Sequence, residues 1–324
     1  MTPPRRYFIV GGAGFIGSHF ADRLLSDPSV SGVTLYDNFS SGREWHFEHH
    51  RGEPRLNVIR GDAKDGPLLT TSMQGHDVVI HLASNPDIAR AATEPDIDFR
   101  EGTCLTNQVV EAMRRCGVKT ILYASGSGVY GDLGELEASE DHGPLEPIST
   151  YGASKLAGEA LISAYSRMFD LNGRVFRFGN VVGPRQTHGV GFDFLRQLLA
   201  NPRKLRILGD GSQSKSYIHI VDVIEAVLLA ERRSPGRFAV YNVATGDYIR
   251  VSEIAWLAVE SAGLDRSMVE FEYTGGDRGW KGDVPIVRLN TDRIRRLGWT
   301  CRWSTCEALR NSMAAMLADL RAGR

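Results

Sequence analysis

Strand-length apolar segments alternate with stretches of helical periodicity through the first 180 residues, and this alternation limits the fold more than any other feature. Segments such as YFIV, VTLYD and DVVIHLA are continuously apolar rather than alternating between apolar and polar positions. Such strands are expected where helices cover both faces of a parallel sheet, and repeated strand–helix units build that sheet. We therefore predict an α/β fold with a doubly wound parallel sheet.

Beyond residue 184 the alternation becomes less regular, which predicts a second, smaller α/β lobe. We expect a first domain over residues 1–184 and a smaller lobe over 185–324, some segments of which return to the first domain. Helices are expected near 15–26, 100–116, 151–169 and 191–200, with further helices before the C-terminus.

The balance of charges excludes several classes of partner. The chain has 38 basic and 39 acidic residues, so its net charge of −1 favours neither nucleic acid nor a membrane surface. No apolar run approaches the roughly 20 residues of a membrane span, and MTPPRRYFIV lacks the apolar core of a signal peptide. Four cysteines at irregular spacing indicate free thiols and a cytoplasmic location.

The only histidine cluster is WHFEHH, at residues 45–50. No cysteine or carboxylate pattern accompanies it in the sequence, so we interpret it as a solvated helical turn and expect no metal site.

A glycine-rich turn stands between the first strand and the first helix in YFIVGGAGFIGSH. Gly11 permits a tight turn, Gly14 lets the backbone approach a pyrophosphate, and Gly17 lets helix and strand pack closely. The free N–H groups at the start of the following helix favour a phosphate. The spacing is G-x-x-G-x-x-G, and its position predicts a dinucleotide site of the Rossmann type.

Two aspartates at the ends of the next strands strengthen this interpretation. Asp37 lies 20 residues after Gly17, where a carboxylate binds the ribose hydroxyls and repels a 2′-phosphate, so NAD is favoured over NADP. Arg43 nearby is a residue that can accommodate such a phosphate. Asp62 follows the third strand, where it either meets the adenine or caps a helix.

Tyr151 and Lys155 in STYGASKLAGE are spaced i and i+4, so a helix places them on one face. By frequency alone this is a surface pair. After a dinucleotide site it becomes a candidate catalytic pair, because an ammonium and a cationic nicotinamide both stabilise a phenolate. We expect them to lower the pKa of Tyr151 toward the range of a general base, and Lys155 can also hold the ribose.

The segment ASGSGVYG, residues 124–131, follows a predicted strand and carries two hydroxyls near the same edge of the sheet. It is either a featureless turn or the floor of a site in which Ser125 or Ser127 takes part in the chemistry.

Taken in order, GGAGFIG, YDN, HLAS, YGASK, RFGNVVGPRQ and LGDGSQSKSYIHIVDV resemble the extended short-chain dehydrogenase/reductase family, and within it the NAD-dependent nucleotide-sugar epimerases and dehydratases. The resemblance spans nearly the whole chain. It implies that Tyr151 is the base, with Lys155 as its partner and Ser125 or Ser127 as the assisting hydroxyl. The cofactor-binding residues that it implies are Gly11, Gly14, Phe15, Ile16, Gly17, Asp37, Asn38, Asp62, Ala63, Leu82, Ala83, Ser84, Tyr151 and Lys155. The substrate-binding residues that it implies are Ser84, Ser125, Asn180, Lys215 and Arg278.

Three departures from the family pattern bear on the reaction. Relatives often carry Ser or Thr where this chain has Gly126, and asparagine where it has Phe99. Dehydrating relatives carry Asp-Glu where this chain has Ser127 and Gly128, so dehydration is disfavoured.

The reaction implied is inversion at C4 of a nucleotide-activated sugar, a UDP-hexose that is plain, N-acetylated or uronic, with NAD as cofactor in a homodimer. The alternatives are a nucleotide-sugar dehydrogenase or decarboxylase of the same fold, or a non-catalytic NAD-binding sensor.

Overall fold

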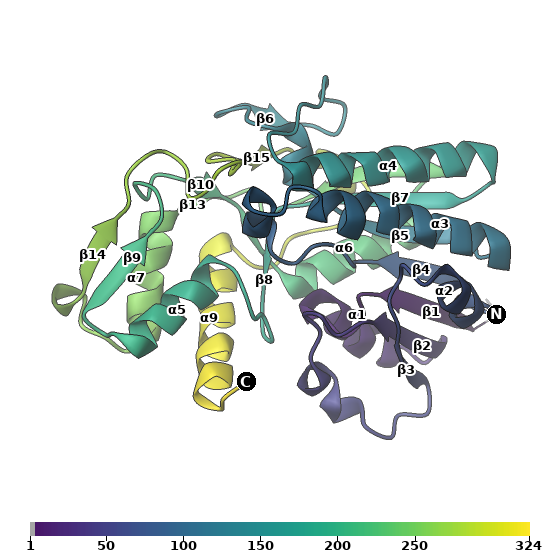
Figure 1. Cartoon of the computed structure of the whole chain (residues 1–324), viewed down its shortest axis with the longest axis horizontal. Coiled ribbons are helices and arrows are strands. Elements are labelled where there is room, and N and C mark those ends of the chain that lie inside the picture. The colour runs from purple at the N-terminus through teal and green to yellow at the C-terminus, as the bar shows by residue number, and fades with distance from the viewer. Residues whose placement is uncertain (1–3) are drawn as a thin grey trace. The chain divides into compact units, whose positions relative to one another are not determined.

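The computed structural model describes residues 4–324 and divides the chain into two compact units (Figure 1). Unit 1 contains the residues up to Val129 together with Thr150–Arg177 and Ala226–Tyr241. Unit 2 contains Tyr130–Ser149, Phe178–Glu225 and Asn242–Arg324. Each unit thus takes segments from both sides of residue 184.

A seven-stranded sheet forms the centre of unit 1, in the order β12-β7-β5-β4-β1-β2-β3. Its strands are β1 (Arg5–Val10), β2 (Val30–Asp37), β3 (Leu56–Arg60), β4 (Val78–His81), β5 (Thr120–Gly126), β7 (Asn172–Phe178) and β12 (Phe238–Val243). The pairs β1–β2, β1–β4, β2–β3 and β4–β5 are all parallel. This is the Rossmann-like α/β fold that the sequence predicts.

Helices cover both faces of this sheet. They are α1 (Phe15–Leu25), α2 (Gly66–Met73), α3 (Leu105–Cys116), α4 (Thr150–Met168) and α6 (Ile220–Arg233). Phe8 and Val10 pack in one core cluster with apolar residues of α2, α3 and α4. Side chains alternate between the two faces of a strand, so the fully buried Ile9 points to the face opposite to that of Phe8 and Val10. Helix α1 lies on this second face. It follows β1 in the chain and packs along β2.

A π-helix over Phe99–Cys104 precedes α3 where the sequence predicts ordinary helix from about residue 100. α4 approaches this segment so closely that a Cβ on Gly102 would lie 2.6 Å from Ser154 Oγ, so this position requires glycine. π-Helical turns are frequent at functional sites. Phe99 begins this segment and is 59% exposed.

Unit 2 has a core of its own, made mainly by three helices, α5 (Val190–Ala200), α7 (Val251–Ser261) and α9 (Thr305–Arg321). The capping box of Ser304 and Glu307 fixes the start of α9. Unit 2 also contains the 3₁₀ turn Arg266–Met268, a short helix α8 and eight short strands. These elements are α8 (Asp292–Arg295), β6 (Glu137–Ala138), β8 (Asn180–Val182), β9 (Lys204–Ile207), β10 (Ser214–Lys215), β11 (Tyr217–His219), β13 (Ile249–Arg250), β14 (Glu270–Tyr273) and β15 (Arg288–Leu289).

Over residues 4–324, no helix combines the length and the apolar composition that a bilayer span requires. All four cysteines lie in this range, and all four are free thiols, as the sequence predicts.

Candidate active site

The register of the parallel strands brings the candidate cofactor residues to one edge of the sheet. Val10 pairs with Tyr36 on one side and with His81 on the other, and His81 pairs with Tyr123. The segments that begin at Gly11, Asp37, Leu82 and Ala124 therefore leave the sheet at the same level. In an open parallel sheet this carboxyl edge is where ligands bind.

The turn after β1 needs glycine at two positions for different reasons. Gly11 has φ +81°, and a Cβ there would lie 2.8 Å from the Ala83 backbone nitrogen. A Cβ on Gly17 would lie 2.5 Å from the Gly11 carbonyl oxygen. Within residues 4–324, no side chain caps the first turn of α1, so the N–H groups there are available to a phosphate.

Asp37 joins the glycine turn to the end of β2. Its two carboxylate oxygens accept hydrogen bonds from Ala13 N at 2.9 Å and from Phe39 N at 2.7 Å. Burial raises the pKa of this carboxyl above its ordinary value, while the two N–H donors lower it. A carboxylate has about four lone-pair sites, so Asp37 can accept further hydrogen bonds from ribose hydroxyls.

Asp62 lies beside Asn38 and does not cap the helix that follows. Its carboxylate accepts from Lys64 N at 2.9 Å, and Asn38 Nδ2 lies 3.5 Å from its other oxygen. The cap of α2 is Asp65, which accepts from Leu68 N at 3.1 Å. Asp62 therefore stands at the end of β3 with its side chain half-exposed.

The remaining candidate cofactor residues lie in the same turns. Leu82 N and Ala83 N both donate to the Val10 carbonyl oxygen, which fixes the segment after β4 against the glycine turn. Phe15 and Ile16 begin α1, and the buried Ala63 follows Asp62. Together, the glycine cradle, the uncapped helix start and the Asp37 carboxylate fit a dinucleotide.

Tyr151 and Lys155 lie on the first turns of α4, as the spacing predicts. Lys155 is fully enclosed, and its Nζ donates to the Ala124 carbonyl oxygen at 2.8 Å. The same Nζ lies 5.4 Å from the centre of the Tyr151 ring. Burial lowers the pKa of Lys155 to about 8, and the carboxylates of Asp98 and Glu159 act against that shift.

The pKa of Tyr151 depends on burial and on two neighbouring side chains. Burial raises it to about 12, and the charge of Asp98 adds to the rise. The group that lowers it is the Ser84 side chain, which hydrogen-bonds to the phenol. The Lys155 ammonium donates to Ala124 O and lies over the ring. Ser84 is thus the group whose hydrogen bond favours the phenolate.

Ser125 and Ser127 occupy different surroundings. Ser125 is buried, and its Oγ donates to Glu159 Oε1 at 2.6 Å. Glu159 also forms a bidentate ion pair with Arg177, with Nη2 2.7 Å from Oε2. Ser127 begins the short 3₁₀ turn Ser127–Tyr130 after β5 and is half-buried. Ser125 thus belongs to a buried ion-pair network.

Asp98 is a second buried carboxylate close to the pair, and sequence reasoning missed it. It accepts from Asn85 Nδ2 at 2.9 Å and from Thr150 Oγ1 at 2.7 Å. Nothing in the local sequence marks Asp98, which reaches the site through the turn before α3. Glu159 did carry a signal, since it follows Lys155 by four residues and so shares the helix face of the pair.

In unit 2 two of the three candidate substrate residues, Lys215 and Arg278, both bond to Asp283, and the third, Asn180, bonds to the backbone beside Lys215. Asn180 begins β8, and its Nδ2 donates to Ser216 O at 3.3 Å, next to Lys215. Lys215 Nζ is 2.6 Å from Asp283 Oδ1. Arg278 donates to Asp283 O and to Asp132 Oδ2, both at 2.6 Å. The loop 278–283 thus holds the cations Lys215 and Arg278 together through Asp283.

The fold and the site of unit 1 define a dinucleotide-binding enzyme with a half-buried tyrosine and a buried lysine at the cofactor edge. Residues 7–244 match the NAD dependent epimerase/dehydratase family. The chain belongs to this family, and its cofactor is NAD.

Named relatives carry out two kinds of reaction. The chain is 32% identical to a UDP-glucose 4-epimerase of Mycolicibacterium smegmatis, over 94% of this chain and 96% of that protein. It is also 32% identical to a dTDP-glucose 4,6-dehydratase of Streptomyces griseus, over 86% of each. Its fold matches a crystal structure of a UDP-galactose 4-epimerase with a TM-score of 0.86 and 35% identity, covering 97% of this chain and 99% of that one.

Proposed function

We propose that the protein inverts C4 of a nucleotide-activated sugar, a UDP-hexose, without a net change in oxidation state. The relatives named as 4-epimerases support this proposal at the level of the family. The observation that carries it is the composition of the turn after β5. Ser127 and Gly128 stand there, where the family's dehydrating members carry an acid and a base.

Elimination of water requires proton-transfer groups beyond the tyrosine. The two buried carboxylates beside the pair cannot supply them, because each is already bound. Glu159 is held by Arg177 and Ser125, and Asp98 is held by Asn85 and Thr150. A reaction confined to one carbon needs only the base and the cofactor.

In the proposed mechanism, Tyr151 takes the proton from the C4 hydroxyl of the sugar. NAD, which the glycine turn and Asp37 would hold, would supply the hydride acceptor and donor that inversion at this carbon requires. The Ser84 hydroxyl stabilises the phenolate of Tyr151. The Lys155 ammonium, fixed by Ala124 O, supplies positive charge below the ring and a contact for the ribose. Tyr151 then reprotonates the inverted alkoxide.

Ser127 is the assisting hydroxyl that we assign to the sugar. Ser125 donates a hydrogen bond to the buried Glu159, whereas Ser127 is half-buried at the start of a turn at the cofactor edge. We further propose that Asn180, Lys215 and Arg278 bind the diphosphate of the substrate. Two cations in one group suit two phosphates, and Asp283 positions them.

Proton NMR of the purified protein with UDP-hexoses, UDP-N-acetylhexosamines and UDP-uronic acids tests the proposal. The expected result is a new H4 and anomeric signal with the nucleotide intact, no accumulation of NADH, and loss of turnover in Tyr151→Phe. A 4-keto-6-deoxy product would instead identify a dehydratase, and stoichiometric NADH a dehydrogenase. NAD binding without turnover of any sugar would identify a sensor. Each of these three results contradicts the proposal.

A further inference from the structure

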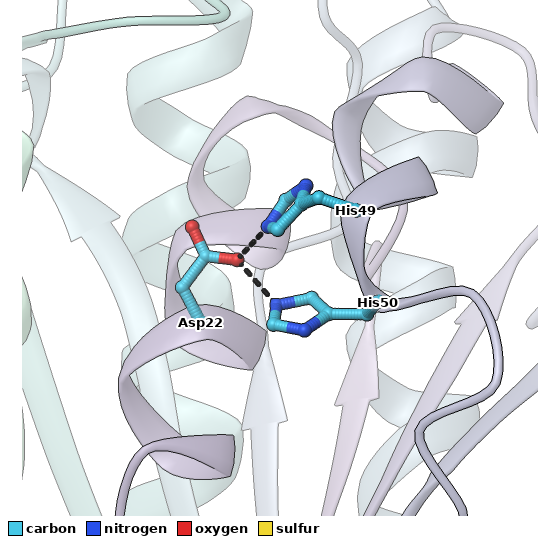
Figure 2. A group of neighbouring side chains, drawn as sticks. All are labelled: Asp22, His49 and His50. Carbon is cyan, nitrogen blue, oxygen red and sulfur yellow. Dashed lines mark hydrogen bonds and ion pairs between the residues drawn. The ribbon is translucent and has the colours of Figure 1, made fainter.

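The histidine-rich segment differs from the solvated helical turn that the sequence predicts. It forms two 3₁₀ turns, Glu44–His46 and Glu48–His50, and His46 is fully buried. The neighbouring histidines His49 and His50 both turn toward α1 (Figure 2). There they meet Asp22, a carboxylate that lies 27 residues earlier in the sequence and was not part of the sequence pattern.

The three side chains converge on one point. Nε2 of His49 lies 2.8 Å from Asp22 Oδ1, and Nε2 of His50 lies 2.7 Å from the same oxygen. The donor atoms of all three residues lie within 4.8 Å of one another. The side chains are 33% (Asp22), 49% (His49) and 18% (His50) exposed, so an ion can reach the cluster from solvent.

We propose that Asp22, His49 and His50 form a binding site for a divalent transition-metal ion of the Zn²⁺ class. Two imidazole nitrogens and one carboxylate oxygen are a common ligand set for zinc, with a water as fourth ligand. Zinc–ligand bonds of about 2.0–2.1 Å in a tetrahedron separate the donor atoms by about 3.3 Å. The observed separations from the carboxylate oxygen are about half an ångström shorter, a difference that small side-chain rotations remove.

Such an ion replaces the two hydrogen bonds now directed at Oδ1. Each imidazole carries its proton on Nδ1 and presents the Nε2 lone pair to the metal, as in other neutral histidine ligands. The ring centroids of His49 and His50 are 4.2 Å apart, so the two ligands approach the ion side by side.

The site has a structural consequence for the cofactor turn. The segment that carries these histidines also contacts the glycine turn: Arg43 N donates to Ala13 O, and the His46 ring nitrogen Nδ1 lies 2.8 Å from the same oxygen. An ion that joins this segment to α1 therefore stabilises the surroundings of the NAD site without touching Tyr151 or Lys155. The metal is structural and takes no part in the sugar chemistry.

Zinc binding by the NAD-loaded protein tests this inference. The protein is stripped with EDTA, its thiols are alkylated so that cysteines cannot bind the ion, and it is dialysed against ZnCl₂. Bound zinc is then measured by mass spectrometry. The variants are Asp22→Asn and His49→Gln, and the matched control is His188→Gln, which removes an exposed histidine of unit 2.

The expected result is one zinc per chain in the wild type and in His188→Gln, with binding weakened at least about 10-fold in the two cluster variants. Zinc should also raise the melting temperature of the wild type and the control but not of Asp22→Asn. Metal-free melting temperatures verify that each variant is folded. Equal zinc binding in all four proteins, or none in the wild type, overturns the proposal, and neither result bears on the epimerase activity.

Discussion

The buried ion pair between Glu159 and Arg177 supports the floor of the proposed active site, and Glu159→Gln tests how strongly. The two side chains are only 5% and 4% exposed, and Glu159 also accepts from Ser125. Gln keeps the shape and an acceptor oxygen but leaves the Arg177 guanidinium without its counter-charge. Removing one partner of a buried pair costs about 3–5 kcal/mol.

For a unit of this size, about 1 kcal/mol corresponds to a shift of about 2–4 °C in melting temperature. The expected fall for Glu159→Gln is therefore about 6–20 °C, measured by circular dichroism or calorimetry. Glu159 also raises the pKa of Lys155. Its loss should thus shift the alkaline limb of the activity profile to lower pH, a change that a purely structural role does not produce.

Two controls distinguish the effect of burial on the melting temperature from the effect of losing an ion pair as such. The surface pair of Arg310 and Glu260 has the same 2.7 Å separation but is 46% and 45% exposed, so Glu260→Gln should leave the melting temperature essentially unchanged. The double variant Glu159→Gln/Arg177→Met removes both buried charges and should recover most of the lost stability. If Glu159→Gln melts like Glu260→Gln, the reasoning about the buried pair is wrong.

Three further predictions concern single positions. Ser84→Ala should raise the pKa of Tyr151 and move the rising limb of the pH–kcat profile to higher pH. Ser84→Thr keeps the hydroxyl and should restore the profile. A profile that does not move in Ser84→Ala would rule out the Ser84 hydrogen bond as the contact that stabilises the phenolate. Lys155 binds its proton more weakly in the folded protein, with a pKa of about 8, than in the unfolded chain at 10.5. The free energy of unfolding of the wild type should therefore rise, relative to that of Lys155→Met, between pH 8 and pH 10.5. Chemical denaturation at several pH values in that range measures this difference, and a flat or falling difference would contradict the prediction. Gly126→Ser should leave the melting temperature unchanged, because a Cβ there meets no atom of residues 4–324 within 4 Å, whereas Gly102→Ser should lower it because of Ser154.

Local sequence was enough to predict the parts of this protein that depend on short-range periodicity. The apolar strands, the glycine turn after β1, Asp37 at the end of β2 and the helical spacing of Tyr151 and Lys155 all follow from residues close together in the chain. Parallel pairing then carries these segments to one edge, because successive strands in such a sheet end at the same level.

Charge balance and burial were decided by the tertiary structure. Asp98 reaches the Tyr151–Lys155 pair from a segment that no motif marks, and burial shifts the pKa values of both members of the pair. Which serine reaches the phenol could not be predicted either, since Ser84 and Ser125 both end apolar strands.

Residues close together in the chain were enough to predict the fold class, the cofactor edge and the helical pairing of Tyr151 with Lys155. Three contacts depend on the packed fold instead: Ser125 bonds to a buried carboxylate, Ser84 bonds to Tyr151, and Asp22 meets two histidines. The difference lies in the distance along the chain over which each interaction acts. Periodicity and turn chemistry act between neighbours in the chain, whereas desolvation and ion pairing depend on which distant groups the packed core brings within a few ångströms.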